Sequence, residues 1–298
     1  MEEQTYVTVE GNQIRISNPQ KLLWEDPPIT KAEYLRKLAI LAPYLLRYCR
    51  RRYLTTIRYP HGINGPFFYQ KNCPEPAPEF VRTAELNGVN YVDLDSLSTL
   101  IWLGNLACLE FHPSFHHIGS ERPAEWVIDM DPPQEDDPRL VDAALMVGEV
   151  LDKLGITAVP KTSGATGIQF FIPIEPRYTF QQLRALGEFI GRYLAETKPD
   201  LFTIERLKKK RRGLIYFDYL QIWPGKTLSA PYTPRARSFA PVSTPLKWSE
   251  LTPSFHPRHF NLETIEQRLE QYGDLIAKTP PQNLDALLEK LGHVSANT

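Results

Sequence analysis

The sequence predicts a mixed fold of the α/β or α+β class, in which β-strands alternate with helices. Short apolar or alternating segments such as EWVIDMD (125–131) are typical of strands. Longer segments with helix-capping residues at their starts separate them. With 298 residues, 42% of them hydrophobic, the chain can bury a good-sized core, as one large domain or two closely joined lobes.

The N-terminal half begins with the alternating segments YVTVE and IRIS. Thr30 is a suitable N-cap for a helix over residues 31–48. Further along, we expect strands at 53–59 and 66–70, a helix over 97–107, and two neighbouring strands, CLEFHPSF (108–115) and EWVIDMD (125–131).

The C-terminal half continues the alternation. Asp137-Pro138 predicts the start of a helix that ends near residue 154, because proline suits the first helical turn. Thr179 and Gln182 form a predicted capping box for a helix that ends near Thr197. The other expected elements are a strand-loop-strand unit (157–174), a strand GLIYFDYLQI (213–222), an irregular proline-rich segment (223–257) and short helices over 263–272 and 284–291.

Composition favours a soluble protein of the cytoplasm, without a membrane partner. No apolar run approaches the length of a membrane span, and the acidic, alternating N-terminus is unlike a signal peptide. The three cysteines, Cys49, Cys73 and Cys108, are scattered without ligand-like spacing, which indicates a reducing compartment.

Positive charge is concentrated in two runs, although the net charge is only −1. The runs are LKKKRRG (207–213) and RYCRRRY (47–53), and each leads into a predicted strand. A solvated surface is the ordinary interpretation of such a run. Their position before strands favours a phosphate-binding surface instead.

Three aspartates form the most informative pattern. Asp129 and Asp131 are two residues apart at the end of an apolar strand, so they point to the same face, and Pro132-Pro133 ends that strand. Asp218 interrupts the apolar run LIYFDYL. Each could be a structural ion-pair residue. Together they favour a Mg²⁺ or Mn²⁺ site, and hence phosphoryl or nucleotidyl transfer.

Two other segments could bind phosphate. KTSGATG (161–167) is a small-residue loop that can offer backbone N–H groups and Ser163. GKTLSAPYTPRAR (225–237) brings Lys226 and Arg235 soon after Asp218. Glycine-rich loops are common and proline-rich loops often carry scattered charge, so either segment alone is weak evidence.

In this order and spacing, the motifs of the chain resemble the polymerase domain of bacterial DNA ligase D, a member of the archaeo-eukaryotic primase superfamily used in non-homologous end joining. The resemblance spans residues 12–275 and rests on NPQKLLW, ITKAEYL, GPFFYQKN, LACLEFHPS, IDMDPP, TSGATGIQFFIP, IYFDYLQ and GKTLSAPYTPRARSFAPVSTPLKW. It implies an α+β fold with a primase-like core, in which an RRM-like sheet packs with helices beside an N-terminal α/β lobe. We expect one domain over 1–298, without a ligase or nuclease domain, that is either a stand-alone polymerase or an excised domain.

The resemblance also implies roles for residues at matching positions. Asp129, Asp131 and Asp218 match catalytic metal ligands. Matches to nucleotide-binding residues are His112, Ser163, Gln169, Lys226 and Arg235. Matches to DNA-binding residues are Lys21 and Lys31 for a 5′-phosphate, Phe67 and Phe68 for stacking on the template, and Arg211 for positioning the primer end.

The implied activity is addition of nucleotides to 3′-hydroxyl ends at gapped or broken DNA with a 5′-phosphate. The implied cofactor is Mn²⁺ or Mg²⁺, with two ions bound. The implied substrates are NTPs or dNTPs, with a preference for ribonucleotides. The implied partners are Ku and a separate ATP-dependent DNA ligase, in the cytoplasm of a prokaryote and associated with its nucleoid.

The chain departs from the family pattern in one loop. Many relatives have a basic residue and a histidine where this chain has Thr166 and Gln169. Gln169 can donate a hydrogen bond to phosphate, but it cannot be charged. A catalytically weak DNA-end-binding module is therefore the alternative function. A metal-dependent phosphatase or nuclease is a third.

Overall fold

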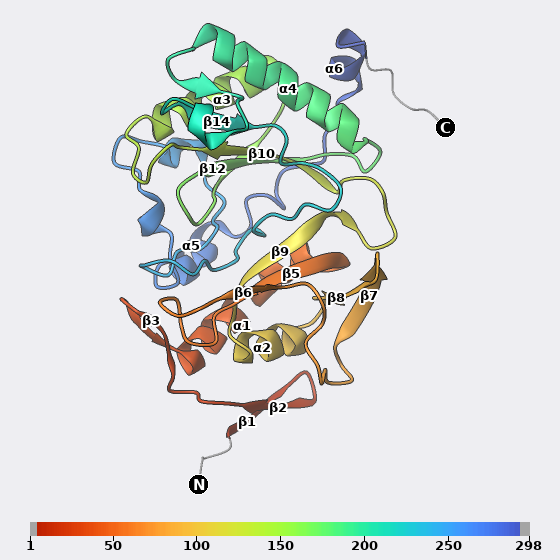
Figure 1. Cartoon of the computed structure of the whole chain (residues 1–298), viewed down its shortest axis with the longest axis vertical. Coiled ribbons are helices and arrows are strands. Elements are labelled where there is room, and N and C mark those ends of the chain that lie inside the picture. The colour runs from red at the N-terminus through yellow and green to blue at the C-terminus, as the bar shows by residue number, and fades with distance from the viewer. Residues whose placement is uncertain (1–4, 293–298) are drawn as a thin grey trace. The chain divides into compact units, whose positions relative to one another are not determined.

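The structure is a computed structural model that describes residues 5–292 (Figure 1). Its chain forms two compact units. Unit 1 contains residues 5–114, 227–243 and 258–271, and unit 2 contains residues 115–226, 244–257 and 272–292. Neither unit is a continuous stretch of sequence.

Unit 1 contains a five-stranded sheet. The sheet has the order β6-β5-β8-β7, and β9 also pairs with β5. Its strands are β5 (Arg52–Arg58), β6 (Phe68–Gln70), β7 (Arg82–Leu86), β8 (Val89–Asp93) and β9 (Cys108–His117), whose last residues belong to unit 2. The other elements of unit 1 are the hairpins β1 (Thr5–Val9)/β2 (Asn12–Ile16) and β3 (Leu22–Glu25)/β4 (Pro28–Thr30), and helices α1 (Lys31–Cys49), α2 (Leu97–Asn105) and most of α5 (Ile265–Tyr272).

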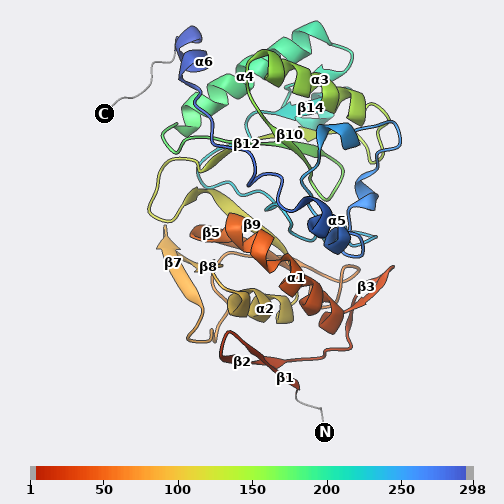
Figure 2. The ribbon, with the colours of Figure 1, turned by 180° about the vertical axis from the view of Figure 1, so that it is seen from behind.

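Helix α1 begins where the sequence predicts. The Thr30 side chain accepts a hydrogen bond from the Glu33 backbone, and the Glu33 carboxylate accepts one from the Thr30 backbone, which completes a capping box. Figure 2 shows α1 and α2 side by side. They pack so closely that a Cβ added at Gly104 of α2 would come within 2.6 Å of a Leu38 methyl group. A larger residue at this contact would force the Leu38 and Leu35 side chains to shift.

Two expectations for unit 1 need correction. The hairpin β7–β8 was not predicted, although its two-residue turn, Asn87-Gly88, has the positive φ angles of 52° and 78° that such hairpins use. The predicted neighbours 108–115 and 125–131 lie in different sheets, because β9 pairs with β5 whereas β10 pairs with β12 and β14.

Unit 2 is built on a second sheet, of order β11-β12-β10-β14-β13. Its strands are β10 (Glu125–Asp131), β11 (Val159–Thr162), β12 (Ile168–Pro173), β13 (Phe202–Thr203) and β14 (Ile215–Asp218), antiparallel except for the β13–β14 pair. The helices of unit 2 are α3 (Leu140–Lys153), α4 (Phe180–Thr197) and α6 (Asp285–Lys290). Helix α4 starts at the predicted capping box, and α3 starts two residues after Pro138.

The two faces of this sheet have different characters. Figures 1 and 2 both show α3 and α4 on one side of it. Trp126, Ile128 and Met130 of β10 are buried, and Trp126 lies near Gly187 of α4. Because side chains alternate along a strand, Asp129 and Asp131 lie on the opposite face. The hydrophobic packing under α4 thus presents the two carboxylates on the side without these helices.

The segment 223–257 is irregular, as predicted, with a short 3-10 turn at Trp248–Glu250. In the described part of the chain, no helix has the length and hydropathy that crossing a membrane requires.

Candidate active site

Four polar side chains lie in register across the sheet of unit 2. Lys161 on β11 is opposite Gln169 on β12, and Gln169 is opposite Asp129 on β10. Asp129 is in turn opposite Asp218 on β14. Side chains directly opposite each other in antiparallel strands share a face, with Cβ atoms about 4.5–5.5 Å apart. Asp131, two residues beyond Asp129, is on the same face, so the sheet gathers all three aspartates.

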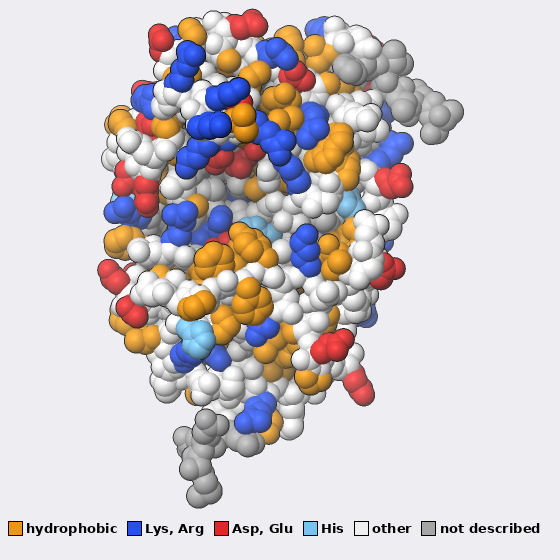
Figure 3. All heavy atoms as spheres, in the orientation of Figure 1, with side chains coloured by type: hydrophobic (Ala, Val, Ile, Leu, Met, Phe, Trp, Pro, Cys, Tyr) orange, Lys and Arg blue, Asp and Glu red, His pale blue; other side chains and the backbone are white. Residues whose placement is uncertain are grey.

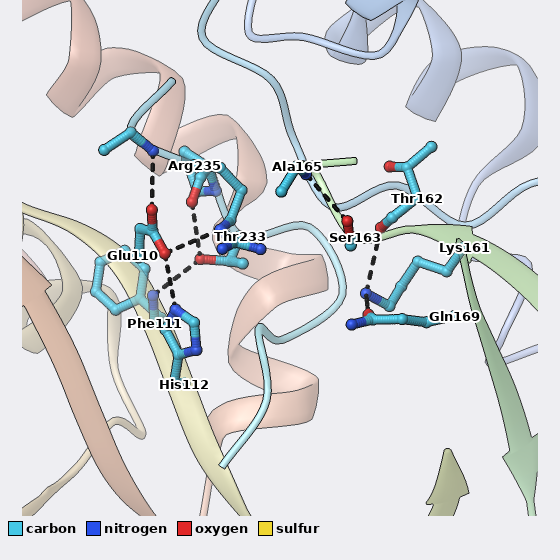
Figure 4. A network of polar contacts seen from close by, with 12 residues as sticks. Glu110, Phe111, His112, Lys161, Thr162, Ser163, Ala165, Gln169, Thr233 and Arg235 are labelled. Carbon is cyan, nitrogen blue, oxygen red and sulfur yellow. Dashed lines mark hydrogen bonds and ion pairs between the residues drawn. The ribbon is translucent and has the colours of Figure 1, made fainter. Parts of the chain in front are cut away.

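Gln169 connects a buried lysine to this carboxylate group. The Lys161 ammonium donates a hydrogen bond to the Gln169 side-chain oxygen, and Figure 4 shows the two groups pointing toward each other. The Gln169 side chain also hydrogen bonds to Asp129. Lys161 is 1% exposed and Gln169 is 2% exposed. Gln169, predicted as a phosphate contact, is therefore engaged within the sheet.

The charges of the three aspartates are not balanced. Burial, followed by the charges of Asp131 and Asp218, raises the pKa of Asp129 to about 7. Its Oδ1 atom is buried without a hydrogen-bond partner among the described residues. Burial and Asp218 also raise the pKa of Asp131, whereas Arg211 and Lys208 act in the opposite direction. A cation bound here would stabilise the ionised forms.

Asp218 is the last residue of β14, not a mid-strand residue as expected. Its Oδ1 accepts hydrogen bonds from the Tyr216 hydroxyl at 3.0 Å and from the Leu220 backbone N–H at 2.9 Å. The second contact closes a turn of the kind that aspartate side chains favour, and it ends the strand. The predicted strand of residues 213–222 is shortened for this reason.

The donor set suits a hard divalent cation, since carboxylate oxygens are preferred ligands of Mg²⁺ and Mn²⁺. The orphaned Oδ1 of Asp129 also fits such an ion. Among residues 5–292, no three His, Cys, Asp or Glu side chains are already arranged to hold a metal ion. Mg²⁺ usually binds through one or two carboxylates together with substrate phosphates, and this mode does not need a closed protein cage.

The loop 163–167 between β11 and β12 has a fixed shape. The Ser163 hydroxyl oxygen accepts hydrogen bonds from the backbone N–H groups of Ala165 and Gly167, both at 3.1 Å. A Cβ at Gly167 would lie 2.4 Å from the Met130 carbonyl oxygen, so only glycine fits against β10. Ser163, predicted as a nucleotide contact, thus shapes the loop beside the aspartates.

Two predicted basic residues of unit 2 contact the neighbourhood of Asp218. Lys226 donates a hydrogen bond from Nζ to the Leu220 carbonyl at 2.9 Å. The Arg211 guanidinium lies 3.6 Å from the ring centre of Tyr216, the residue that bonds to Asp218. Arg211 belongs to the basic segment 208–212, and Figure 3 shows Lys and Arg side chains around acidic ones near β14. The basic run is therefore close enough to act on the carboxylates electrostatically.

His112 and Arg235 are brought together within unit 1 by Glu110. His112 Nε2 and Arg235 Nε each lie 2.9 Å from Glu110 Oε2 (Figure 4). Figure 4 also shows Phe111 bonded through its backbone to Thr233, at 3.0 Å. These contacts hold β9 against the segment 227–243.

Lys21 and Lys31 are close in unit 1, but Lys31 is buried. The Lys31 backbone donates to the Lys21 carbonyl at 2.8 Å, and Lys31 Nζ donates to the Ser17 carbonyl at 2.6 Å. Burial first, and then the charge of Lys21, lower the pKa of Lys31 to about 8. The charged form of Lys31 is therefore disfavoured by burial and by Lys21, and an anion near it would stabilise that charge.

Phe67 and Phe68 are exposed, at 54% and 44%. Phe67 stacks on Tyr59 with ring centres 5.2 Å apart, and Arg58 lies over the Phe68 ring at 5.1 Å. Tyr69, which the sequence analysis did not single out, is 67% exposed. Figure 3 shows hydrophobic side chains gathered over β6. Such an exposed aromatic group offers faces on which nucleobases can stack.

Comparison with known proteins decides the family. The model of the LigD primase-polymerase domain matches residues 30–276. The chain belongs to this family. The chain is similar to a bifunctional non-homologous end joining protein LigD of Bacillus subtilis, with 38% identity over 93% of this chain and 46% of that protein. A multifunctional LigD of Pseudomonas aeruginosa is 32% identical over 87% of this chain and 31% of that protein.

A solved structure, the polymerase domain of Mycobacterium tuberculosis ligase D in complex with DNA, matches with a TM-score of 0.81 and 26% identity. The match covers 90% of this chain and 99% of that one. The LigD primase-polymerase family and the α+β primase-like fold expected from the sequence are thereby confirmed. The chain spans less than half the length of these LigD proteins.

Two residues to which the sequence analysis gave no role make central contacts in the two polar networks described above, one around Gln169 and one around Arg235. Lys161 is the first residue of KTSGATG, and Glu110 lies within LACLEFHPS. A lysine and a glutamate inside strands of mostly apolar residues were the available signal, since a buried charge needs a partner.

Proposed function

We propose that this chain is a divalent-metal-dependent nucleotidyltransferase that adds nucleotides to 3′-hydroxyl ends at gaps or breaks in DNA during non-homologous end joining. The observation that carries the proposal is the register of Asp129 with Asp218, with Asp131 on the same face, in a member of the LigD primase-polymerase family.

Under this proposal, the three aspartates hold Mn²⁺ or Mg²⁺, with two ions as the working number. When bound, the ions supply Lewis-acid chemistry that favours an ionised 3′-hydroxyl and stabilises the leaving pyrophosphate. Asp129 is the aspartate that a bound cation would stabilise most, because its Oδ1 is buried without a hydrogen-bond partner among the described residues. Lys226 and Arg235 neutralise phosphate charge, and His112, Ser163 and Gln169 are further nucleotide contacts.

The DNA contacts are proposed from charge and exposed rings. Phe67 and Phe68 stack on template bases, and Tyr69 extends that group. Lys21 and Lys31 bind the 5′-phosphate on the far side of a gap, and Arg211 positions the primer end. Family resemblance supports a preference for ribonucleotides, and Ku and a separate ATP-dependent ligase as partners in the cytoplasm of a prokaryote.

The deciding experiment is extension of a labelled primer on a gapped, 5′-phosphorylated duplex with Mn²⁺ and either rNTPs or dNTPs. The parent is expected to extend the primer. The Asp129→Ala/Asp131→Ala variant is expected to bind the duplex without extending it. Extension by the double variant would place the chemistry elsewhere.

A DNA-end-binding module with weak catalysis is the second candidate. The engagement of Gln169 by Lys161 and Asp129 favours it, because a side chain held in this way is less available to a phosphate. Tight binding of the gap by the parent without any nucleotide addition would support this candidate and reject the polymerase.

A further inference from the structure

One buried carboxylate in unit 1 contacts two of the proposed nucleotide contacts at once. Glu110 Oε2 lies 2.9 Å from both His112 Nε2 and Arg235 Nε, and its Oε1 accepts a hydrogen bond from the Ala236 backbone at 3.0 Å. Figure 4 shows the carboxylate between the imidazole ring and the arginine side chain. Glu110 and Arg235 are 125 residues apart in the chain, so this group ties two distant segments together.

The contacts are strong because Glu110 is ionised and enclosed. It is 4% exposed, and an unpaired charge there would be costly. Burial raises the pKa of Glu110, but the hydrogen bond with His112 and the positive charges of Arg235 and His112 outweigh burial and lower it to about 2. Charge-assisted hydrogen bonds of this kind are stronger than those between neutral groups.

We propose that Glu110 is a positioning residue for the nucleotide, which fixes His112 and Arg235 as one unit. This inference rests on the proposed function, in which His112 and Arg235 contact the nucleotide. The guanidinium group is planar, so holding Nε sets the directions of its terminal nitrogens. A side chain ordered before binding loses less conformational entropy when the ligand arrives, and affinity rises accordingly.

The test measures ATP affinity under conditions where no addition can occur. The parent and Glu110→Gln are titrated with ATP and Mn²⁺ on a gapped, 5′-phosphorylated duplex whose primer ends in a dideoxynucleotide. Loss of Glu110's charge is expected to raise the Kd for ATP about 10- to 100-fold, by analogy with the loss of partners that orient metal ligands. The affinity for the duplex is expected to stay unchanged. An unchanged Kd for ATP would overturn the inference.

Tyr34→Phe is the matched control for general damage to β9. The Tyr34 hydroxyl is buried and donates to the Cys108 carbonyl at 2.6 Å, on the same strand as Glu110. This variant is expected to lower the melting temperature without changing the Kd for ATP. If Tyr34→Phe weakened ATP binding as much as Glu110→Gln did, the effect would be structural and the inference would fail.

A mutant cycle separates positioning from a general structural role. If Glu110 acts only through His112 and Arg235, then adding Glu110→Gln to a variant that already carries His112→Ala and Arg235→Gln should weaken ATP binding no further. Losses that add would overturn the inference and leave the proposed function standing. If Arg235→Gln and His112→Ala both left ATP binding unchanged, these nucleotide contacts of the proposed function would be wrong, and the inference with them.

Should Glu110→Gln fail to fold, Glu110→Asp provides the measurement. It keeps the charge but withdraws it by one methylene group, so both contacts lengthen. A raised Kd for ATP with normal duplex binding would support positioning, and a parental Kd would reject it.

Discussion

Lys161 donates a hydrogen bond to the side-chain oxygen of Gln169, although both side chains are almost completely buried. A buried ammonium group needs compensation, and the nearest negative charge in this row is Asp129, to which Gln169 also bonds. The amide thus connects a cation on β11 to a carboxylate on β10. Gln169, at a position where many relatives are expected to have a histidine, thus supports Asp129, a proposed metal ligand.

Replacing Lys161 should therefore destabilise the apo-protein. Lys161→Met keeps the length of the side chain but leaves the Gln169 oxygen buried without its donor. We expect the free energy of unfolding to fall by about 1–3 kcal/mol. Urea unfolding monitored by circular dichroism measures this loss. Lys153→Met, on the exposed side of α3, is the control, and equal stabilities of both variants would show that the Lys161–Gln169 bond contributes nothing.

Removing one aspartate should separate stability from activity. Burial and Asp218 both raise the pKa of Asp131, so Asp131→Asn removes a charge that is disfavoured without a cation. We expect a stability gain of about 0.5–2 kcal/mol with loss of nucleotide addition. Differential scanning calorimetry and primer extension test the two parts, with exposed Asp142→Asn as control. A less stable Asp131→Asn protein would mean that the carboxylates do not repel each other.

Metal addition should stabilise the parent more than Asp131→Asn. An ion that binds only the folded state adds about 2.7 kcal/mol when its free concentration is 100 times its Kd. The measurement is the melting temperature during a Mn²⁺ titration without DNA or nucleotide. Equal shifts in both proteins would indicate that the ion binds at another place.

Glu110 should make stability depend on pH in the acid range. Its pKa falls from an ordinary value of 4.5 to about 2 on folding, so its contribution is complete above 4.5 and is lost as the pH falls toward 2. The contribution is on the order of 3 kcal/mol. Urea unfolding over this range should show a steeper loss in the parent than in Glu110→Gln. Parallel profiles would contradict the ion-pair assignment.

Lys31 should give 5′-phosphate recognition an alkaline limit. Its pKa is lowered to about 8 by burial and by Lys21, and phosphate binds the charged form. The preference for a 5′-phosphorylated gap should decline as the pH rises through about 8, and Lys31→Ala should abolish it. Fluorescence anisotropy with phosphorylated and unphosphorylated gaps measures this, with exposed Lys290→Ala as control. A preference that persists in Lys31→Ala would assign the phosphate to other residues.

Folding linkage gives the same lysine an independent signature. Because the folded pKa lies below the ordinary value of 10.5, the unfolded chain binds more protons between these two values. Stability should therefore rise between about pH 8 and pH 10.5, and this rise should be absent in Lys31→Ala.

Local signals in the sequence predicted much of the fold. The capping boxes at Thr30 and Thr179 fix the starts of α1 and α4 through contacts within one helical turn. Alternation along residues 125–131 correctly placed Asp129 and Asp131 on one face. The hairpin β7–β8 was also within reach, because Asn87-Gly88 is a strong turn signal, but its strands are short and largely polar.

Other features depend on pairing between distant segments, which a single sequence does not reveal. The register of Asp129 with Asp218 joins strands 89 residues apart. The assignment of β9 and β10 to different sheets is of the same kind. Residues Glu110 and Lys161 were overlooked because their partners, Arg235 and Gln169, are identified only once the strands are assembled.

The close packing of Gly167 against β10 limits which substitutions the loop 163–167 can accept. No side chain fits at 167, and Ser163 and Gln169 are bound into the frame around it, whereas Thr166 is only half-buried. Thr166 is thus a position in the loop where a different side chain can enter with little disturbance of these contacts. A lysine or arginine at position 166 would add positive charge to the loop while leaving the contacts of Ser163, Gly167 and Gln169 in place.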